Sequence, residues 1–100
     1  MPCADFTFLG FLPHKKGRET LFKEIAASER TMIFYESPHR ILKTLESLIE
    51  HLDEKRKVIV CRELTKVFEE LVSGTASEVK GYFESHPDKV RGEMVVIVST

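Results

Sequence analysis

The sequence predicts an α/β fold in which a mixed sheet of about five strands packs against helices. Short apolar runs of strand length alternate along the chain with amphipathic segments of helical period. Two of the runs follow each other with no helix between them, so the predicted order is strand, helix, strand, helix, strand, strand, helix, strand. The last run, residues 94–98, is almost continuously apolar, which is typical of a strand in the middle of a covered sheet.

The first half of the chain contains two predicted strands, each followed by a helix. These elements are a strand at 6–12, a helix at 19–28, a strand at 31–35 and a helix at 38–52. Gly10 indicates a bulge in the first strand. Ser37 is a good N-cap residue and Pro38 suits the first helical position, so we expect the second helix to begin there. A continuous apolar stripe gives this helix the strongest signal in the chain.

The second half contains the pair of strands without an intervening helix. Its elements are a strand at 57–62, a strand at 68–73, a helix at 77–85 and a strand at 94–98. The segment 68–73 is ambiguous, because its two consecutive glutamates suit a helix whereas Leu71 and Val72 suit a strand, and we predict a short strand. Thr75 and Glu78 match a capping box at the start of the last helix.

Composition and charge limit the class of protein. The 100 residues, 42% hydrophobic and 31% charged, suffice for one domain with its own core. A formal net charge of −1 excludes binding to nucleic acid through bulk positive charge, while a local basic patch stays compatible with it. No apolar run approaches the roughly 20 residues that span a bilayer, and no signal-peptide pattern precedes the domain. We therefore expect a cytoplasmic protein.

Several common kinds of site are also excluded. The two cysteines, Cys3 and Cys61, are too few for a disulfide framework, and Cys61 is expected to be a reduced, buried thiol. The chain has no Gly-rich phosphate loop and no serine at a nucleophile elbow. The four histidines lack the spacing of metal ligands, so we expect no metal site.

Polar side chains gather where the predicted strands end. Residues 34–40 read Phe-Tyr-Glu-Ser-Pro-His-Arg and join a strand to a helix, and residues 62–66 read Arg-Glu-Leu-Thr-Lys at the end of the next strand. In open α/β sheets, ligands bind at strand ends that face helix N-termini. The two junctions therefore predict part of a ligand site. Gly92 and Glu93 add the start of the last strand, which a flat ligand could approach closely.

The charged residues of these junctions have more than one interpretation. Glu36 is either an ordinary surface carboxylate or an acceptor for a ligand's hydroxyl or amine groups. His39 and Arg40 fall in the first turn of the predicted helix, where the helix dipole disfavours cations. Their presence there indicates an anionic partner, which is Glu36, Glu63 or a phosphate. The alternative to a functional role is that they form an ordinary internal salt bridge. The basic loop at 14–18 similarly either contacts phosphate or is a solvated turn.

Five short motifs in this order carry a resemblance. They are Phe-Leu-Pro at 11–13, Lys-Lys-Gly-Arg at 15–18, the junction motifs at 34–40 and 62–66, and Gly-Glu at 92–93. Together they resemble the C-terminal half of the tetrapyrrole (corrin/porphyrin) methylase family, in its branch of ribosomal-RNA 2'-O-methyltransferases. The resemblance covers almost the whole chain, and the two junction motifs distinguish this branch from the porphyrin enzymes.

The resemblance implies a two-lobed enzyme that binds S-adenosylmethionine between two α/β domains. Residues 1–100 are then the C-terminal lobe, the N-terminal lobe is absent from this chain, and the isolated lobe should be inactive. The expected reaction methylates the ribose 2'-hydroxyl of a cytidine in small-subunit (16S) rRNA. The expected partners are small-subunit rRNA or the ribosomal subunit, the N-terminal lobe and a second copy in a homodimer. We expect exposed apolar surface that the other lobe would cover.

The resemblance also assigns roles to residues. The cofactor-binding residues that it implies are Tyr35, Glu36, Ser37, Glu63, Leu64, Thr65, Gly92, Glu93 and Met94. The candidate contacts to RNA are Lys15, Lys16, Arg18, His39 and Arg40. Methyl transfer needs an in-line approach and is helped by a general base. Glu36, His39 and Lys66 have suitable chemistry for that base, and the catalytic residue stays open.

Two rival functions fit the same residues. A corrin or porphyrin methyltransferase is disfavoured by the basic loop and by the motif at 34–40. A free-standing RNA-binding or protein-interaction module would show salt-sensitive affinity for RNA without any response to S-adenosylmethionine. Binding assays with a tetrapyrrole and with RNA therefore separate the three functions.

Overall fold

The computed structural model describes residues 6–12, 16–53, 55–65, 68–90 and 92–99, and for 63–65, 68–69 and 89 it describes the backbone alone. The elements follow in the order β1 (Phe6–Phe11), α1 (Arg18–Ala27), β2 (Thr31–Glu36), α2 (Ile41–His51), β3 (Val58–Thr65), β4 (Phe68–Gly74), α3 (Ala76–Ser85), η1 (Pro87–Lys89) and β5 (Glu93–Val98). Apart from the short 3-10 helix η1, this is the predicted succession of strands and helices.

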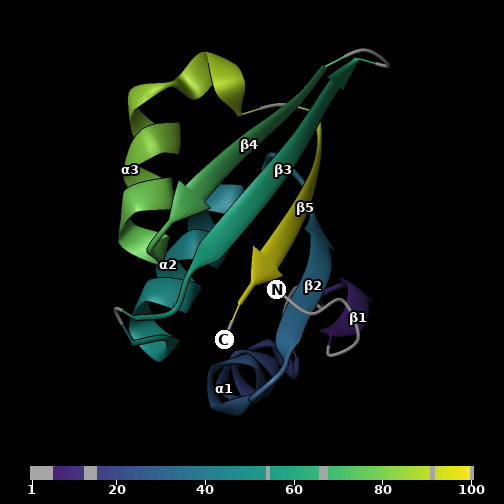
Figure 1. The fold of residues 1–100 in the computed structure, drawn as a ribbon, viewed down its shortest axis with the longest axis vertical. Coiled ribbons are helices and arrows are strands. Elements are labelled where there is room, and N and C mark those ends of the chain that lie inside the picture. Colours follow the sequence, from purple (N-terminus) through teal and green to yellow (C-terminus); the bar gives the residue numbers. More distant parts are fainter. Residues whose placement is uncertain (1–5, 13–15, 54, 66–67, 91, 100) are drawn as a thin grey trace.

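The strands form one mixed sheet in the order β1-β2-β5-β3-β4 (Figure 1). β1 and β2 are parallel and are connected through α1, whereas the other neighbouring pairs are antiparallel. β5 lies between β2 and β3, which confirms that the most apolar strand is central. The register between β1 and β2 shifts between Phe8 and Gly10, so the predicted irregularity at Gly10 is confirmed.

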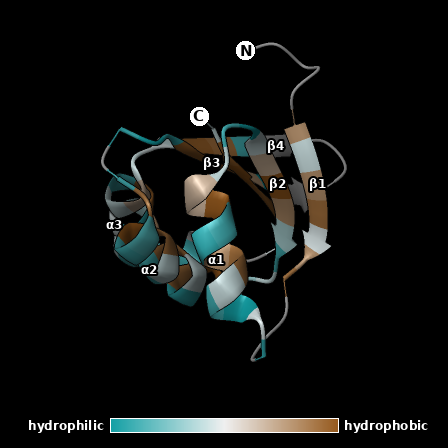
Figure 2. Ribbon diagram, turned by 90° about the horizontal axis from the view of Figure 1, so that it is seen from below, coloured by the Kyte–Doolittle hydropathy of each residue, from teal (hydrophilic) through white to brown (hydrophobic). Residues whose placement is uncertain are grey.

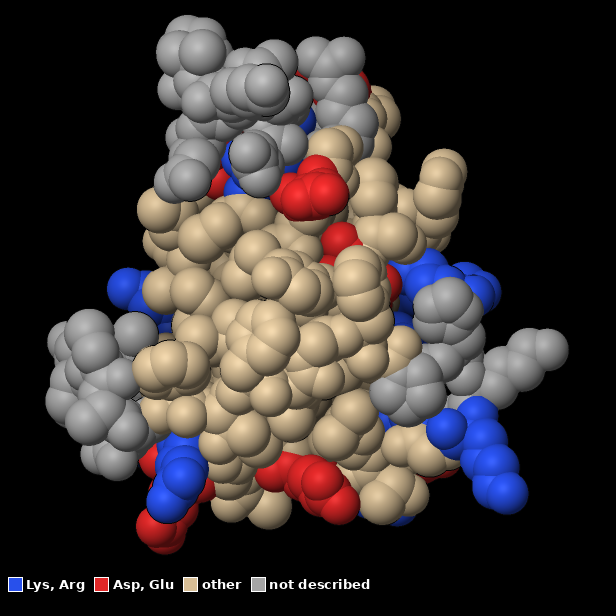
Figure 3. Space-filling view, turned by 90° about the vertical axis from the view of Figure 1, so that its right-hand side faces the viewer, with Lys and Arg blue, Asp and Glu red and all other residues tan. Residues whose placement is uncertain are grey.

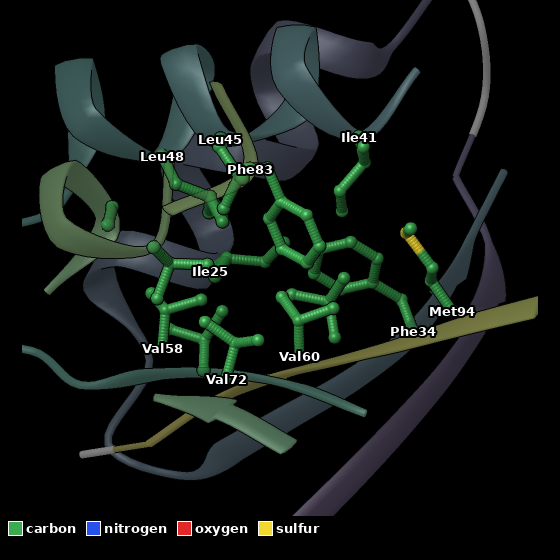
Figure 4. Packing of buried hydrophobic residues seen from close by; sticks show 14 of the residues in the cluster. Ile25, Phe34, Ile41, Leu45, Leu48, Val58, Val60, Val72, Phe83 and Met94 are labelled. Carbon is green, nitrogen blue, oxygen red and sulfur yellow. The ribbon is translucent and has the colours of Figure 1, made fainter. Parts of the chain in front are cut away.

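The described α-helices all lie on one side of the sheet, and that side is the core (Figure 2). Alternate positions of the strands face the helices, so Val58 and Val60 of β3 and Val96 of β5 are fully buried. The buried apolar residues of the helices are Phe22, Ile25, Ile41, Leu45, Leu48, Ala76, Val79 and Phe83. Figure 4 shows Ile25, Leu45 and Phe83 among those packed against the strands. We call this side of the sheet the covered face.

The opposite side, which we call the open face, is apolar but exposed. Phe6 and Phe8 of β1 are 47% and 52% exposed, Tyr35 of β2 is 39% exposed and Leu71 of β4 is 64% exposed. Seen from the side where β1 and β2 lie, the molecule presents a broad area of uncharged side chains with acidic and basic groups around it (Figure 3). The prediction of exposed apolar surface is therefore confirmed.

The second helix begins later than predicted. α2 begins at Ile41, and its N-cap residue is Arg40, whose side chain makes no cap hydrogen bond. Residues 37–40 instead form a turn, closed by a 3.0 Å hydrogen bond from the Arg40 N–H to the Ser37 carbonyl. Pro38 takes the second position of that turn, for which its fixed φ is well suited. The prediction that Ser37 caps this helix is wrong because serine and proline suit a turn as well as a helix start.

The ambiguous segment and the last helix agree with the prediction. β4 is a strand, paired antiparallel with β3, and β3 extends to Thr65, beyond its predicted end. The capping box of α3 is confirmed, because the Thr75 hydroxyl accepts the Glu78 N–H at 3.2 Å and the Glu78 carboxylate accepts the Thr75 N–H at 3.0 Å.

Candidate functional site

The candidate site lies where the ends of three neighbouring strands meet. β1 and β2 are parallel, so both end at the same edge, with Phe11 beside Tyr35. β5 is antiparallel to β2, so its start meets the end of β2, and Glu36 pairs with Met94. The topology of the sheet thus brings together residues that are far apart in the sequence.

A hollow of about 370 Å³ opens at this edge. Its lining residues are Phe11, Tyr35, Glu36, Ser37, Pro38, Gly92, Glu93 and Met94. The rings of Phe11 and Tyr35 are exposed and lie 5.2 Å apart between centroids. Gly92 has a φ of 85°, a conformation that favours glycine, so a side chain at this position would strain the entry into β5. The size and the mixed aromatic and polar lining are typical of a small-molecule site.

Two of the three groups predicted to bind a cofactor, residues 35–37 and 92–94, line this hollow. The third group borders the same edge, because β3 is antiparallel to β5 and pairs Glu63 with Glu93. The side chains of Glu63, Leu64 and Thr65 lie outside the described residues. The structure therefore brings the predicted strand ends together, and their roles toward a cofactor stay predictions.

Glu36, the last residue of β2, is only 5% exposed and its carboxylate is bound inside the protein. Its Oε1 accepts the Ser37 N–H at 2.9 Å, and its Oε2 accepts the hydroxyl of Thr44 on α2. Arg18 Nη2 donates to Thr44 Oγ1 at 2.8 Å and lies 4.0 Å from Glu36 Oε2. An internal ion pair is therefore what the structure shows for Glu36. Its cation is Arg18, and among the described ion pairs none joins Glu36 to His39 or Arg40.

A second ion pair lies on the covered face, two strands away, and joins a buried arginine to a half-buried glutamate. Arg62 of β3 is 1% exposed, and its Nη2 donates to Glu70 Oε2 of β4 at 2.6 Å. The hydroxyl of Tyr82 on α3 donates to the other oxygen of Glu70 at 2.5 Å. That hydrogen bond, with a smaller contribution from desolvation, raises the pKa of Tyr82 above its ordinary value of 10.0.

The two ion pairs belong to one row across the sheet. Strand pairing aligns Glu36 with Met94, Met94 with Arg62, and Arg62 with Glu70. Each pair is tied to helices, Glu36 to α1 and α2 and Glu70 to α3. Met94, which lines the hollow, therefore lies between the strand positions that carry the two polar clusters.

The described residues among those predicted to contact RNA lie near the starts of α1 and α2. Lys16 and His39 are exposed and Arg40 is half-buried, whereas Lys15 lies outside the described residues, as does Lys66. Arg18, the first residue of α1, contacts Glu36 at the end of β2, so the start of this helix lies beside the hollow. The guanidinium of Arg18 also lies over a phenyl ring, 5.0 Å from its centroid, and thus faces the interior.

Sequence reasoning missed Thr44 and the burial of Arg62, although both carry a signal. Thr44 lies three residues after Ile41 and within the apolar stripe of α2, and a polar side chain in such a stripe needs a buried partner. Arg62 follows Val60 at the period of two that places it on the covered face. Periodicity thus identifies both residues as buried polar groups.

Three findings concern other kinds of site. Within the described ranges, no group of three His, Cys, Asp or Glu side chains could hold a metal ion. The helices in the described part of the chain are too short or too polar to cross a membrane. Cys61 forms no disulfide with another described residue, and its side chain is half-buried where a buried one was expected.

The chain is similar in sequence to proteins named "Ribosomal RNA small subunit methyltransferase I". It is 44% identical to the one from Haemophilus influenzae over 94 residues, covering 93% of this chain and 33% of that protein. It is 42% identical to the one from Escherichia coli O157:H7 over 99 residues (98% and 35%), and 39% identical to the one from Thermotoga maritima over 98 residues (98% and 43%). The chain thus spans between a third and under half of the length of these curated relatives.

The fold is similar to those of two solved methyltransferases. The cobalamin biosynthetic enzyme cobalt precorrin-4 methyltransferase, CbiF, matches with a TM-score of 0.66 and 15% identity, over 99% of this chain and 42% of that chain. The methyltransferase CobJ matches with a TM-score of 0.64 and 20% identity, over 96% and 41%. At such identities the likeness shows the fold alone. The model of the family Tetrapyrrole (Corrin/Porphyrin) Methylases matches residues 3–80, which is most of the chain. The chain therefore belongs to the tetrapyrrole (corrin/porphyrin) methylase family, as its motifs predict.

Proposed function

We propose that this chain is the C-terminal lobe of an S-adenosylmethionine-dependent methyltransferase that acts on small-subunit rRNA. The proposed acceptor is the ribose 2'-hydroxyl of a cytidine. The observation that carries the proposal is the hollow formed by the ends of β1 and β2 and the start of β5. Relatives at 39–44% identity, whose names specify small-subunit rRNA, support the substrate.

The lining of the hollow suits the methyl donor. Phe11, Tyr35 and Pro38 offer flat apolar surfaces of the kind on which a purine ring packs. Glu93 is exposed, and its carboxylate can accept hydrogen bonds from ribose hydroxyls or from an amino group. S-adenosylmethionine, when bound, supplies a methyl group on a positively charged sulfur that is already activated for transfer.

In this proposal the lobe forms one wall of the donor cleft, and an N-terminal lobe forms the other. Transfer then depends on aligning the hydroxyl and on removing its proton. Glu36 is poorly suited as the base, because its oxygens already accept hydrogen bonds inside the protein. His39 and Lys66 are the remaining candidates on this lobe, and His39 is exposed in the turn at 37–40, whose first two residues line the hollow.

We assign contacts with RNA to the cations around the starts of α1 and α2. Lys16, His39 and Arg40 can lie against backbone phosphates, and Lys15 precedes Lys16 in the same basic loop. Arg18 is a weaker candidate, because its guanidinium is bound inside the protein. An rRNA substrate places the enzyme in the cytoplasm, with the N-terminal lobe and a second copy as its proposed protein partners.

The first test is calorimetric titration of S-adenosylhomocysteine into the full-length protein, with Tyr35→Ala beside wild type. Tyr35 lines the hollow with an exposed ring, so its removal takes away binding surface without opening the core. We expect about tenfold weaker binding. The matched control is Phe6→Ala, which removes another exposed ring that is not among the residues lining the hollow and should bind like wild type.

Methyl transfer is then measured as incorporation of labelled methyl groups into small ribosomal subunits that lack the modification. Donor binding together with this incorporation supports the proposed function. Donor binding with transfer to a tetrapyrrole instead of rRNA contradicts the substrate. Salt-sensitive RNA binding in a protein that does not bind S-adenosylhomocysteine contradicts the enzyme and supports the non-catalytic module.

A further inference from the structure

We propose that Glu36 is a positioning residue of the donor pocket and not a ligand of the donor. This inference rests on the proposed function, since it states how the wall of that site is held. Half-buried Arg18 and the buried residues Thr44 and Glu36 form a cluster that we call the clamp. The clamp fixes residues 35–38, which line the hollow, against α1 and α2.

The hydrogen bonds of Glu36 connect the wall of the hollow to the helices. Its Oε1 binds the N–H of Ser37, the next residue of the wall, at 2.9 Å. Its Oε2 accepts the hydroxyl of Thr44, which lies on the buried side of α2. One carboxylate therefore holds the backbone at Ser37 in a fixed position relative to α2. Rotation of the Glu36 side chain toward a ligand would break both bonds.

Arg18 completes the clamp from α1. Its Nη2 donates to Thr44 Oγ1 at 2.8 Å, so Thr44 accepts from Arg18 and donates to Glu36. The guanidinium lies 4.0 Å from Glu36 Oε2 and supplies the charge that a nearly fully buried carboxylate requires. The guanidinium also lies over the ring of Phe22, which restricts movement of the Arg18 side chain away from Glu36. The carboxylate is thus neutralised and hydrogen-bonded without any ligand.

Thr44 allows the positioning role to be tested apart from ligand contact. Thr44 is fully buried and is not among the residues that line the hollow. Its hydroxyl can therefore affect donor binding only through its two partners in the clamp, Glu36 and Arg18, and the backbone that Glu36 holds. If Glu36 contacted the donor directly, the loss of the Thr44 hydroxyl would leave that contact in place.

The Arg62–Glu70–Tyr82 cluster, in which the carboxylate is half-buried, supplies a control of the same chemistry. Tyr82 donates its hydroxyl to Glu70 as Thr44 does to Glu36, and Arg62 supplies the cation as Arg18 does. Neither Tyr82 nor Glu70 lines the hollow. Tyr82→Phe therefore removes a hydroxyl-to-carboxylate bond of the same kind without touching the wall of the pocket.

The experiment compares Thr44→Val, Thr44→Ser and Tyr82→Phe in the full-length protein, with Glu36→Gln as a fourth variant. We expect Thr44→Val to weaken S-adenosylhomocysteine binding about fivefold to tenfold, because one hydrogen bond that holds the wall is lost. Thr44→Ser keeps the hydroxyl and should restore affinity, and Tyr82→Phe should bind like wild type. Hydrogen exchange of the Ser37 amide is measured by NMR without ligand. It should be faster than in wild type in Thr44→Val and unchanged in Thr44→Ser and Tyr82→Phe.

Two results would overturn the inference. Wild-type affinity in Thr44→Val combined with lost binding in Glu36→Gln would make Glu36 a direct ligand. Equal weakening by Tyr82→Phe and Thr44→Val would attribute the effect to general loosening of the domain. If the wild-type protein does not bind the donor at all, the proposed function fails. The exchange of the Ser37 amide still tests the clamp in that case: faster exchange in Thr44→Val supports it, and unchanged exchange contradicts it.

Discussion

The two faces of the sheet are built from the same strands but differ in burial. Phe34 and Tyr35 are neighbours in β2, yet Phe34 is 0% exposed on the covered face and Tyr35 is 39% exposed on the open face. In β4, Val72 is 8% exposed and Leu71 is 64% exposed. Both faces are apolar, so composition does not decide burial here; the position of the helices does. Exposed apolar areas of this kind mark interaction surfaces.

The largest expected effect compares an aromatic ring on each face. Phe34→Ala opens a cavity in the covered face and should cost about 3–5 kcal/mol of unfolding free energy. Phe8→Ala removes a ring that is 52% exposed and packs edge-on against Tyr35, so we expect a loss below about 1 kcal/mol. Urea unfolding of both variants measures the difference. Equal losses would show that a partner covers the open face even in dilute solution.

A smaller effect is expected from the buried ion pair of the covered face. Arg62→Ala leaves the Glu70 carboxylate without its cation and should cost about 3 kcal/mol. Leu71→Ser, one residue from Glu70 but on the open face, should change stability by no more than about 0.5 kcal/mol. It should also lower the binding of a hydrophobic dye, because Leu71 is part of the exposed apolar surface. A large stability loss in Leu71→Ser would contradict the assignment of this face as open.

The smallest effect concerns the phenol of Tyr82, which lies beside the covered face. Tyr35→Phe leaves Tyr82 as the one tyrosine of the chain, so spectrophotometric titration then reports its pKa alone. The bond to Glu70 raises that pKa above 10.0, and Glu70→Gln should move the midpoint back toward the ordinary value. The protonated phenol of Tyr82 stabilises the folded state, and this contribution is fully present below about pH 10 and is lost as the pH rises through the raised pKa. Identical midpoints in the two proteins would contradict the bond.

Much of the fold could be predicted because its signals are local. The short apolar runs of the strands, the apolar stripe of α2 and the capping box at Thr75 each depend on nearby residues, and each agrees with the structure. The start of α2 could not be predicted, because Ser37 and Pro38 favour a turn and a helix start alike. Local sequence offers no way to choose between two structures that use the same residues.

The candidate site was predictable in its position and less so in its detail. Strand ends identify residues 35–37 and 92–94, because sheet topology places the end of β2 beside the start of β5. The partner of Glu36 was not predictable in the same way. Arg18 reaches Glu36 from the start of α1, 18 positions earlier in the sequence, through contacts that only the packed structure creates. His39 and Arg40 are closer to Glu36 in sequence, but neither forms an ion pair with it among the described residues; a pairing with Glu63, whose side chain is not described, stays a prediction.

The central position of β5 has a consequence for how the domain is made. β5 is the last strand of the sheet along the chain, yet it pairs with both β2 and β3. During synthesis, the unit β1-α1-β2-α2 and the unit β3-β4-α3 leave the ribosome before the strand that joins them. Each unit then presents an unpaired strand edge until β5 is inserted, and such edges favour aggregation. A single late strand thus converts two half-sheets into one cooperative domain and, in the same step, completes the wall of the hollow.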